Sequence, residues 1–102
     1  MTREFKRGQV WTLPDGHDVL LVFLSGLDEA YGAVLALVLH PPGPNPDTAM
    51  SVVTNAPVAC TAVAVNLQQL RATRFAEASL RGTVASEVMS RVDQALRVVL
   101  DL

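Results

Sequence analysis

The sequence contains a single cysteine, Cys60, which excludes an internal disulfide and any zinc site built from several cysteines. Cys60 lies in the apolar run VACTAVAV (58–65), where a thiol is expected to be a buried small apolar group. Residues MTREFKRG (1–8) lack the apolar segment of a signal peptide, and AVLALVL (33–39) is too short to span a bilayer. The sequence therefore predicts a cytoplasmic protein that does not enter a membrane.

An excess of positive charge is also absent. The net charge is −2 and the isoelectric point is about 5.5, so no global positive field indicates nucleic-acid binding. Contact with a polyanion would have to use a local patch, and on charge alone ordinary solvated surface arginines are the favoured alternative. The candidates for such a patch are Arg3, Lys6, Arg7, Arg71, Arg74 and Arg81.

A set of metal ligands is missing as well. The closest approach to one is Asp15, His17 and Asp18, but residues so close together in one tight turn cannot converge as a coordination shell. We therefore expect no metal and no organic cofactor.

Apolar residues, by contrast, are abundant. They make up 50% of the chain, and the mean hydropathy is +0.31. A length of 102 residues corresponds to one domain, 1–102, and so small a domain leaves apolar surface exposed unless a partner covers it. This favours a homodimer. A composition that is merely rich in alanine and valine remains the alternative.

The apolar pattern predicts short strands. Alternation in QVWTL (9–13), the turn residues Pro14-Asp15-Gly16 and the apolar run DVLLVFLS (18–25) predict a β-hairpin. Trp11 is expected to anchor the core or an interface rather than to stack on a base. The remaining expectations are strands over 32–39, 50–54 and 58–65, a proline-rich surface loop over 41–47, and an irregular segment or short helix over 66–75.

The C-terminal segment predicts a helix from about Ser86 to Leu100. Ser86 is expected to cap its start, Glu87 to suit its first turn, and Asp93 to pair with Arg97. Short antiparallel strands followed by one terminal helix indicate an α+β fold with a small, strongly bent sheet or barrel. The apolar face of the helix recurs at spacings of three and four residues, at Val88, Met89, Val92, Ala95, Leu96 and Val99.

Three segments resemble the MazF/PemK toxin family. RGQVW (7–11) resembles the family's opening, and GTVASEVMSRVDQALRVVLDL (82–102) resembles its ending. Between them, AVNLQQLRATRF (64–75) resembles a family segment in which Gln69, Leu70, Arg71 and Phe75 match. The resemblance implies a small SH3-like antiparallel β-barrel of about five strands with a C-terminal helix, working as a homodimer.

The resemblance also implies a function. It implies the toxin of a type II toxin–antitoxin system, a hydrolase that cleaves single-stranded RNA at short sequences and is blocked by a cognate antitoxin. The related CcdB toxins share this fold but poison DNA gyrase, so the fold does not decide the target. A non-catalytic binding protein, either a gyrase poison or an inactive antitoxin-binding homologue, therefore remains the alternative.

The sequence departs from the family where the chemistry is expected. The family's second strand opens with Arg-Pro and its third ends with a Thr-Ser-like segment, whereas this chain has His17-Asp18 and His40-Pro41 there. A neutral imidazole as base and a protonated one as acid can cleave RNA without a metal. We therefore predict that His17 and His40 are catalytic and that the RNA contacts are Arg7, Arg71, Arg74 and Gln69. The alternative is that both histidines are ordinary strand-end residues.

Overall fold

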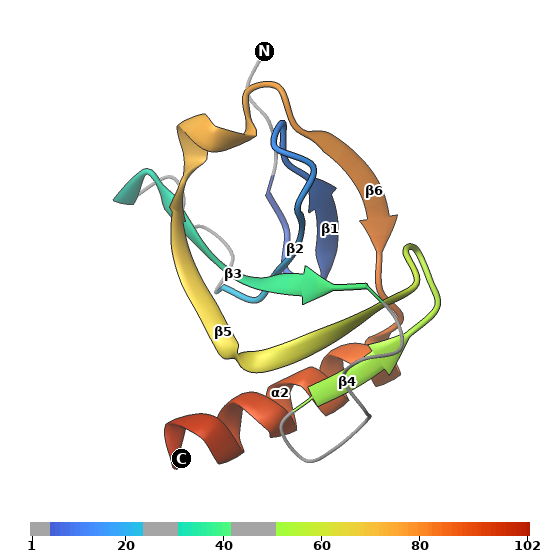
Figure 1. The fold of residues 1–102 in the computed structure, drawn as a ribbon. Coiled ribbons are helices and arrows are strands. Elements are labelled where there is room, and N and C mark those ends of the chain that lie inside the picture. Colours follow the sequence, from blue (N-terminus) through green and yellow to red (C-terminus); the bar gives the residue numbers. More distant parts are fainter. Residues whose placement is uncertain (1–4, 24–30, 42–50) are drawn as a thin grey trace.

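A computed structural model of the chain describes residues 5–23, 31–41 and 51–102. In this part of the chain, six strands form one antiparallel sheet in the spatial order β4-β5-β3-β2-β1-β6. Figure 1 shows the sheet curled into a half-barrel, with the C-terminal helix lying along β4 and β5. The strands are β1 (Gln9–Thr12), β2 (Asp18–Leu21), β3 (Ala33–His40), β4 (Ser51–Thr54), β5 (Cys60–Arg71) and β6 (Ser79–Thr83), and the helices are the 3-10 turn η1 (Ala72–Phe75) and α2 (Ser86–Leu100).

The predicted α+β architecture is confirmed, with more sheet than the sequence indicated. The β1–β2 hairpin forms as expected, since Leu13 N–H donates to the carbonyl of His17 at 2.8 Å and Gly16 takes the positive φ of 91° that the turn requires. The segment 66–71, predicted to be irregular or helical, is the second half of β5. Its polar side chains lack the apolar alternation from which a strand is predicted. The segment nevertheless pairs with β3, with Arg71 opposite Ala33. Strand β6 was not predicted, because its mostly exposed side chains show no alternation.

Several predictions fall on residues outside the described part of the chain. These are the patch candidate Arg3, most of the loop over 41–47, the first residue of the strand over 50–54, and the last two residues of the run over 18–25. Within the described residues, none of the helices has the length and apolar character needed to cross a membrane.

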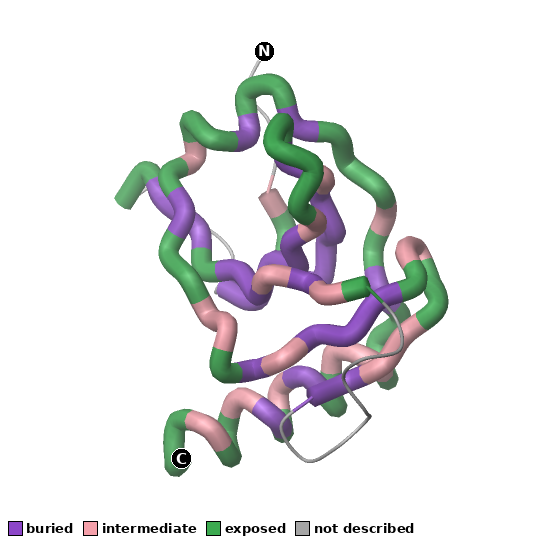
Figure 2. The backbone as a smooth tube through the Cα atoms, viewed as in Figure 1, coloured by how far each residue is buried: buried purple, intermediate pink, exposed green. Residues whose placement is uncertain are grey.

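Two apolar clusters occupy the two faces of the curled sheet. One, built around Val10, Leu20 and Leu37, packs against Val92 and Ala95 of α2. Figure 2 shows buried positions along β1, β2 and the first half of β5, while the η1–β6 connection is largely exposed. Since both faces of β2 are covered, an apolar residue is needed at almost every position of that strand. The cluster on the other face contains Trp11, Leu13, Val19, Leu21, Phe23, Val34, Ala36, Leu70, Phe75 and Ala78.

Aromatic contacts hold η1 against the second cluster. Phe75 is fully buried, and its ring meets that of Trp11 nearly edge-on at a centroid distance of 5.8 Å. Phe5 packs on Phe75 at 5.1 Å. Trp11 is thus a core anchor, as expected, and its indole N–H donates to Oε1 of buried Gln9 at 3.0 Å. These contacts fix the position of the residues that flank Phe75.

Helix α2 has the predicted bounds, but two of its predicted local contacts are wrong. The N-cap is Ala85, in an extended conformation, so Ser86 is already inside the helix and its hydroxyl does not cap it. Asp93 forms its ion pair with Arg7 rather than with Arg97, because the start of β1 packs beside the helix. The apolar face is as expected: Val92 and Ala95 are buried, and Val88, Met89, Leu96 and Val99 pack around them.

Candidate functional site

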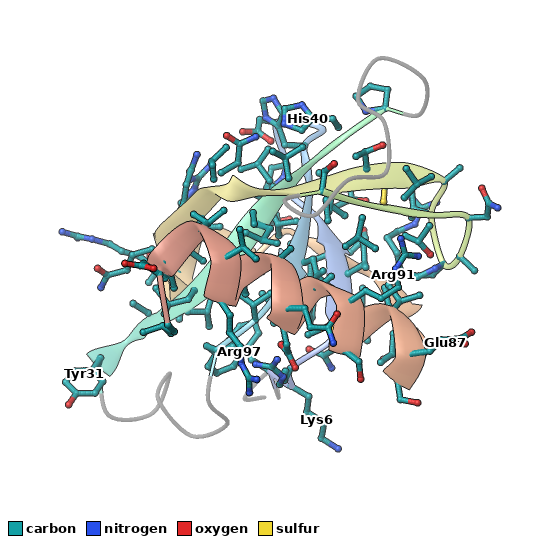
Figure 3. All side chains as sticks on the ribbon, turned by 90° about the horizontal axis from the view of Figure 1, so that it is seen from below. Lys6, Tyr31, His40, Glu87, Arg91 and Arg97 are labelled. Atoms are coloured by element: carbon teal, nitrogen blue, oxygen red, sulfur yellow. The ribbon has the colours of Figure 1, made fainter. Side chains whose placement is uncertain are left out.

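The two histidines come together at one edge of the sheet. His17 directly precedes β2, and His40 is the last residue of β3. These strands pair antiparallel, with Val19 opposite Val38, and the same register continued by two residues places His17 opposite His40. Figure 3 shows His40 on the side of the molecule away from Lys6 and Arg97.

Both histidines line one cavity of about 280 Å³, which we call the two-histidine cavity. Its walls also include Asp18 and the buried thiol of Cys60. Burial raises the pKa of Cys60, and the nearby charge of Asp18 raises it further, so the thiol stays protonated at neutral pH. The remaining lining residues are Gly16, Leu39, Pro41 and Ala59.

Asp15 positions the imidazole of His17. One carboxylate oxygen lies 3.1 Å from His17 Nδ1, and the other accepts the backbone N–H of His17 at 3.0 Å. The backbone N–H of His17, followed by its imidazole, lowers the pKa of Asp15 below 3.8, so this carboxyl is ionised at neutral pH. A carboxylate can only accept, which assigns a proton to Nδ1 of His17 and leaves Nε2 for chemistry.

Asn66 holds the imidazole of His40. Its amide nitrogen lies within hydrogen-bond distance of His40 Nε2. Asn66 reaches the ring because β5 carries extra residues there: Leu37 pairs with Leu67, but Leu39 pairs with Ala62. Figure 1 shows β5 turning a sharp corner in this region. An amide nitrogen only donates, so His40 would accept this hydrogen bond through the lone pair of an unprotonated Nε2.

Arg74 belongs to the same group of side chains. It precedes buried Phe75 in η1, and its guanidinium lies 3.5 Å from Asp15 Oδ2. Arg74 and His17 both line a second cavity of about 250 Å³, so His17 borders both cavities. With half of its side chain exposed, Arg74 can approach a phosphate while it stays near Asp15.

The other predicted RNA contacts lie apart from this group. Gln69 lines a different cavity of about 210 Å³ together with Tyr31. Arg71 is exposed at the end of β5, opposite Ala33. The guanidinium of Arg7 is held by Asp93 and by the carbonyl of Val22, at the end of β1 remote from the β1–β2 turn. The structure therefore brings His17, His40 and Arg74 together, and these three remain the predicted centre of the site.

Sequence reasoning missed the residues that orient the histidines. Asp15 was considered only for the turn and for a rejected metal site, although a carboxylate two residues before a histidine is a readable signal for such a pair. Asn66 gave no signal, because only the bulge in β5 brings it to His40. Among the described residues, no group of three or more His, Cys, Asp or Glu side chains could hold a metal ion.

A curled sheet of antiparallel strands with a terminal helix along one side defines the class of fold. No protein-family model matches the sequence, and no curated protein sequence matches it. Solved structures do match. An endoribonuclease from a mycobacterial species has a TM-score of 0.86 and 20% identity, covering 100% of this chain and 96% of that one.

Two further solved structures are also similar to this chain over nearly its whole length. A chain of the MazE-MazF complex from Deinococcus radiodurans has a TM-score of 0.83 and 15% identity, covering 99% of this chain and 100% of that one. A mycobacterial endoribonuclease in complex with its cognate antitoxin has a TM-score of 0.76 and 21% identity, covering 94% of each chain. The chain therefore has the MazF fold that the sequence resemblance implied. At these identities the similarity defines the fold, and the function has to be argued from the site.

Proposed function

We propose that this chain is the toxin of a type II toxin–antitoxin pair and acts as a sequence-specific endoribonuclease on single-stranded RNA, without a metal. The observation that carries the proposal is that His17 and His40 line one cavity, at the two strand ends where the family places its catalytic residues. Solved proteins with this fold include endoribonucleases, one of them bound to its antitoxin, which supports the same assignment.

The two imidazoles would divide the proton transfers. His40 would act as the base: with a lone pair on Nε2 it would exchange the hydrogen bond from Asn66 for the ribose 2′-hydroxyl and take the proton from it. The 2′-oxygen then attacks phosphorus, and the bond from phosphorus to the 5′-oxygen breaks. His17, held through Nδ1 by Asp15 and protonated on both ring nitrogens, would deliver the proton on Nε2 to the leaving 5′-oxygen. The products are a 2′,3′-cyclic phosphate and a 5′-hydroxyl end.

Arg74 would supply positive charge to the reacting phosphate. Its guanidinium lies close to His17, since both side chains contact the same oxygen of Asp15. Negative charge increases on the phosphorus oxygens in the transition state, and a fixed guanidinium stabilises that charge.

Two protein partners follow from the same proposal, a second copy of the chain and an antitoxin. Large apolar side chains are exposed in the described part of the chain, which would suit burial by such partners. The most exposed of the described residues are Leu102 at 88%, Tyr31 at 75%, Val65 at 60%, Val98 at 55% and Leu80 at 51%. We expect the chain to meet both partners, the second copy and the antitoxin, in the cytoplasm.

Cleavage of a mixed-sequence RNA in the presence of a chelator tests the proposal. Wild-type protein should cut the RNA and leave 2′,3′-cyclic phosphate ends. His17→Ala and His40→Ala should each slow cleavage by about 10²–10⁴-fold while retaining the wild-type melting temperature. Arg97→Ala, which changes a residue on the opposite side of the molecule, should cut normally. RNA left intact by folded wild-type protein, or cut at the wild-type rate by both histidine variants, would refute the proposal.

A binding protein on the same fold is the second candidate. The observation that favours it is the absence of the family's Arg-Pro and Thr-Ser-like residues at the starts and ends of these strands. Induced expression in a bacterial host separates the two candidates. Growth arrest with new transcript ends supports cleavage, arrest with DNA-damage signals supports a gyrase poison, and normal growth supports an inactive antitoxin-binding homologue.

A further inference from the structure

The second cavity, which we call the Gln68 cavity, combines apolar walls with a few polar groups. Leu13, Val19, Val38 and Leu70 supply the apolar walls. The polar groups are the Gln68 amide, the Arg74 guanidinium and the Asp15–His17 pair. Leu13, Val19 and Leu70 are buried in the core, so the floor of this cavity is fixed by the fold.

The size of the cavity limits its ligand. About 250 Å³ is less than the roughly 300–1,000 Å³ that drug-sized ligands occupy, so one ring system fits better than a chain of residues. Apolar walls suit the faces of a planar ring, and polar groups at the rim suit its edge. Bases of single-stranded RNA are unstacked and available for this kind of burial.

Gln68 is the group best placed to read such an edge. It lies on β5 opposite Ala36 of β3, and its side chain lines the cavity. Within the described residues, no hydrogen bond is recorded for the Gln68 amide. A carboxamide presents a donor beside an acceptor, the pattern that pairs with the N6 amino group and N7 of adenine.

The cavity also lies in the right place for a nucleotide. His17 borders both the Gln68 cavity and the two-histidine cavity, so a base in the first would adjoin a phosphate in the second. Arg74 lies at the rim, where a backbone phosphate between them would pass. We propose that the Gln68 cavity binds one unstacked nucleobase of the RNA and that Gln68 selects adenine there. This proposal rests on the proposed function for its ligand class.

Binding of uncleavable RNA tests the proposal independently of catalysis. The probes are four trinucleotides, U-X-U, which differ only in the central base and carry 2′-fluoro groups that remove the nucleophile. Titration of methyl-labelled wild-type protein should shift the signals of Leu13, Val19, Val38 and Leu70. The adenine probe should bind about tenfold more tightly than the others.

Matched variants then separate base reading from general affinity. Gln68→Ala should abolish the preference for adenine and leave the binding of the other probes nearly unchanged. Gln68→Glu should also abolish it, because a carboxylate cannot donate to N7. Arg74→Ala should weaken all four probes alike, and Arg97→Ala should change nothing.

Two results would overturn the proposal: a preference for adenine that survives in folded Gln68→Ala, or probe binding that leaves the four methyl signals unshifted. Neither result depends on cleavage. A protein that cuts RNA but fails this test keeps the proposed function and loses the base site. A protein that passes this test but never cuts RNA keeps the base site and loses the nuclease activity.

Discussion

Arg7 forms an ion pair with Asp93, and the same guanidinium donates a 3.0 Å hydrogen bond to the carbonyl of Val22. The two residues belong to RGQVW (7–11) and to the C-terminal segment (82–102), the two ends of the chain that most resemble the MazF/PemK family. These motifs therefore join the first strand to the terminal helix. These two motifs support the fold through contacts away from the strand ends that carry His17 and His40. The residues at those strand ends can therefore differ from the family's residues while the fold is kept.

Removal of the Arg7–Asp93 pair should reduce stability modestly. Both side chains are more than one-third exposed, so we expect a coupling free energy of about 0.5–1 kcal/mol in a double-mutant cycle of Arg7→Ala and Asp93→Ala. Arg7→Ala should cost about 1 kcal/mol more than Asp93→Ala, because it also loses the hydrogen bond to Val22. Urea unfolding measures all three variants. A coupling free energy of zero would contradict the assigned ion pair.

Asp15 should titrate below the ordinary carboxyl range. Its pKa is lowered first by the backbone N–H of His17 and then by the His17 imidazole, so carbon-detected NMR should give a value below 3.8. His17→Ala should raise this pKa only partly, because the backbone N–H remains. An Asp15 pKa that is the same in His17→Ala and wild type would contradict the contact with the imidazole.

The same shift has a consequence for stability. Because the pKa of Asp15 is lower in the folded than in the unfolded protein, its contribution is present above the unfolded pKa and is lost as pH falls through the folded pKa. The stability difference between wild type and Asp15→Asn should therefore shrink as pH falls below about 4. A difference that is constant from pH 7 to pH 2 would contradict the Asp15–His17 contacts.

Arg74 should make one phosphate contact that Arg97 does not make. Arg74→Ala should lower affinity for single-stranded RNA and reduce the slope of log affinity against log salt by about 0.7, the value for one neutralised phosphate. Arg97→Ala removes the same charge on the side of the molecule away from His40, and its slope should stay at the wild-type value. Equal slopes for the two variants would show that Arg74 acts only through net charge.

Gly82 should resist substitution more strongly than Gly16. Gly82 lies opposite Val10 at a φ of 142°, and a Cβ there would lie 2.8 Å from Cβ of Pro57. Gly82→Ala should therefore cost about 2–3 kcal/mol in thermal unfolding, from strain and overlap together. Gly16 also has a positive φ, but it has no atoms near its missing Cβ, so Gly16→Ala should cost only about 1 kcal/mol. Similar costs at the two sites would contradict the close approach of Pro57.

Much of the fold was predictable because its signals are local. Alternation around Trp11, the turn at Gly16 and the three-and-four spacing of α2 each depend on neighbours in sequence, and all three elements form as expected. The histidine positions were also readable, since a strand end can be located from its own apolar run. The capping role of Ser86 was wrong, because the exact first residue of a helix depends on how the preceding chain enters it.

The amino-acid sequence by itself determined the period of the β1–β2 hairpin and of α2, the two histidines at strand ends and the motifs that resemble the family of this fold. The tertiary structure alone decided that Asn66 meets His40, that Arg74 meets Asp15, and that Gln68 opens into a cavity beside His17. Those contacts depend on the register shift between β3 and β5 and on the packing of Phe75, which join residues far apart in the chain. Local pattern carries no information about such pairings, because they are set by which strands meet and where the sheet bends.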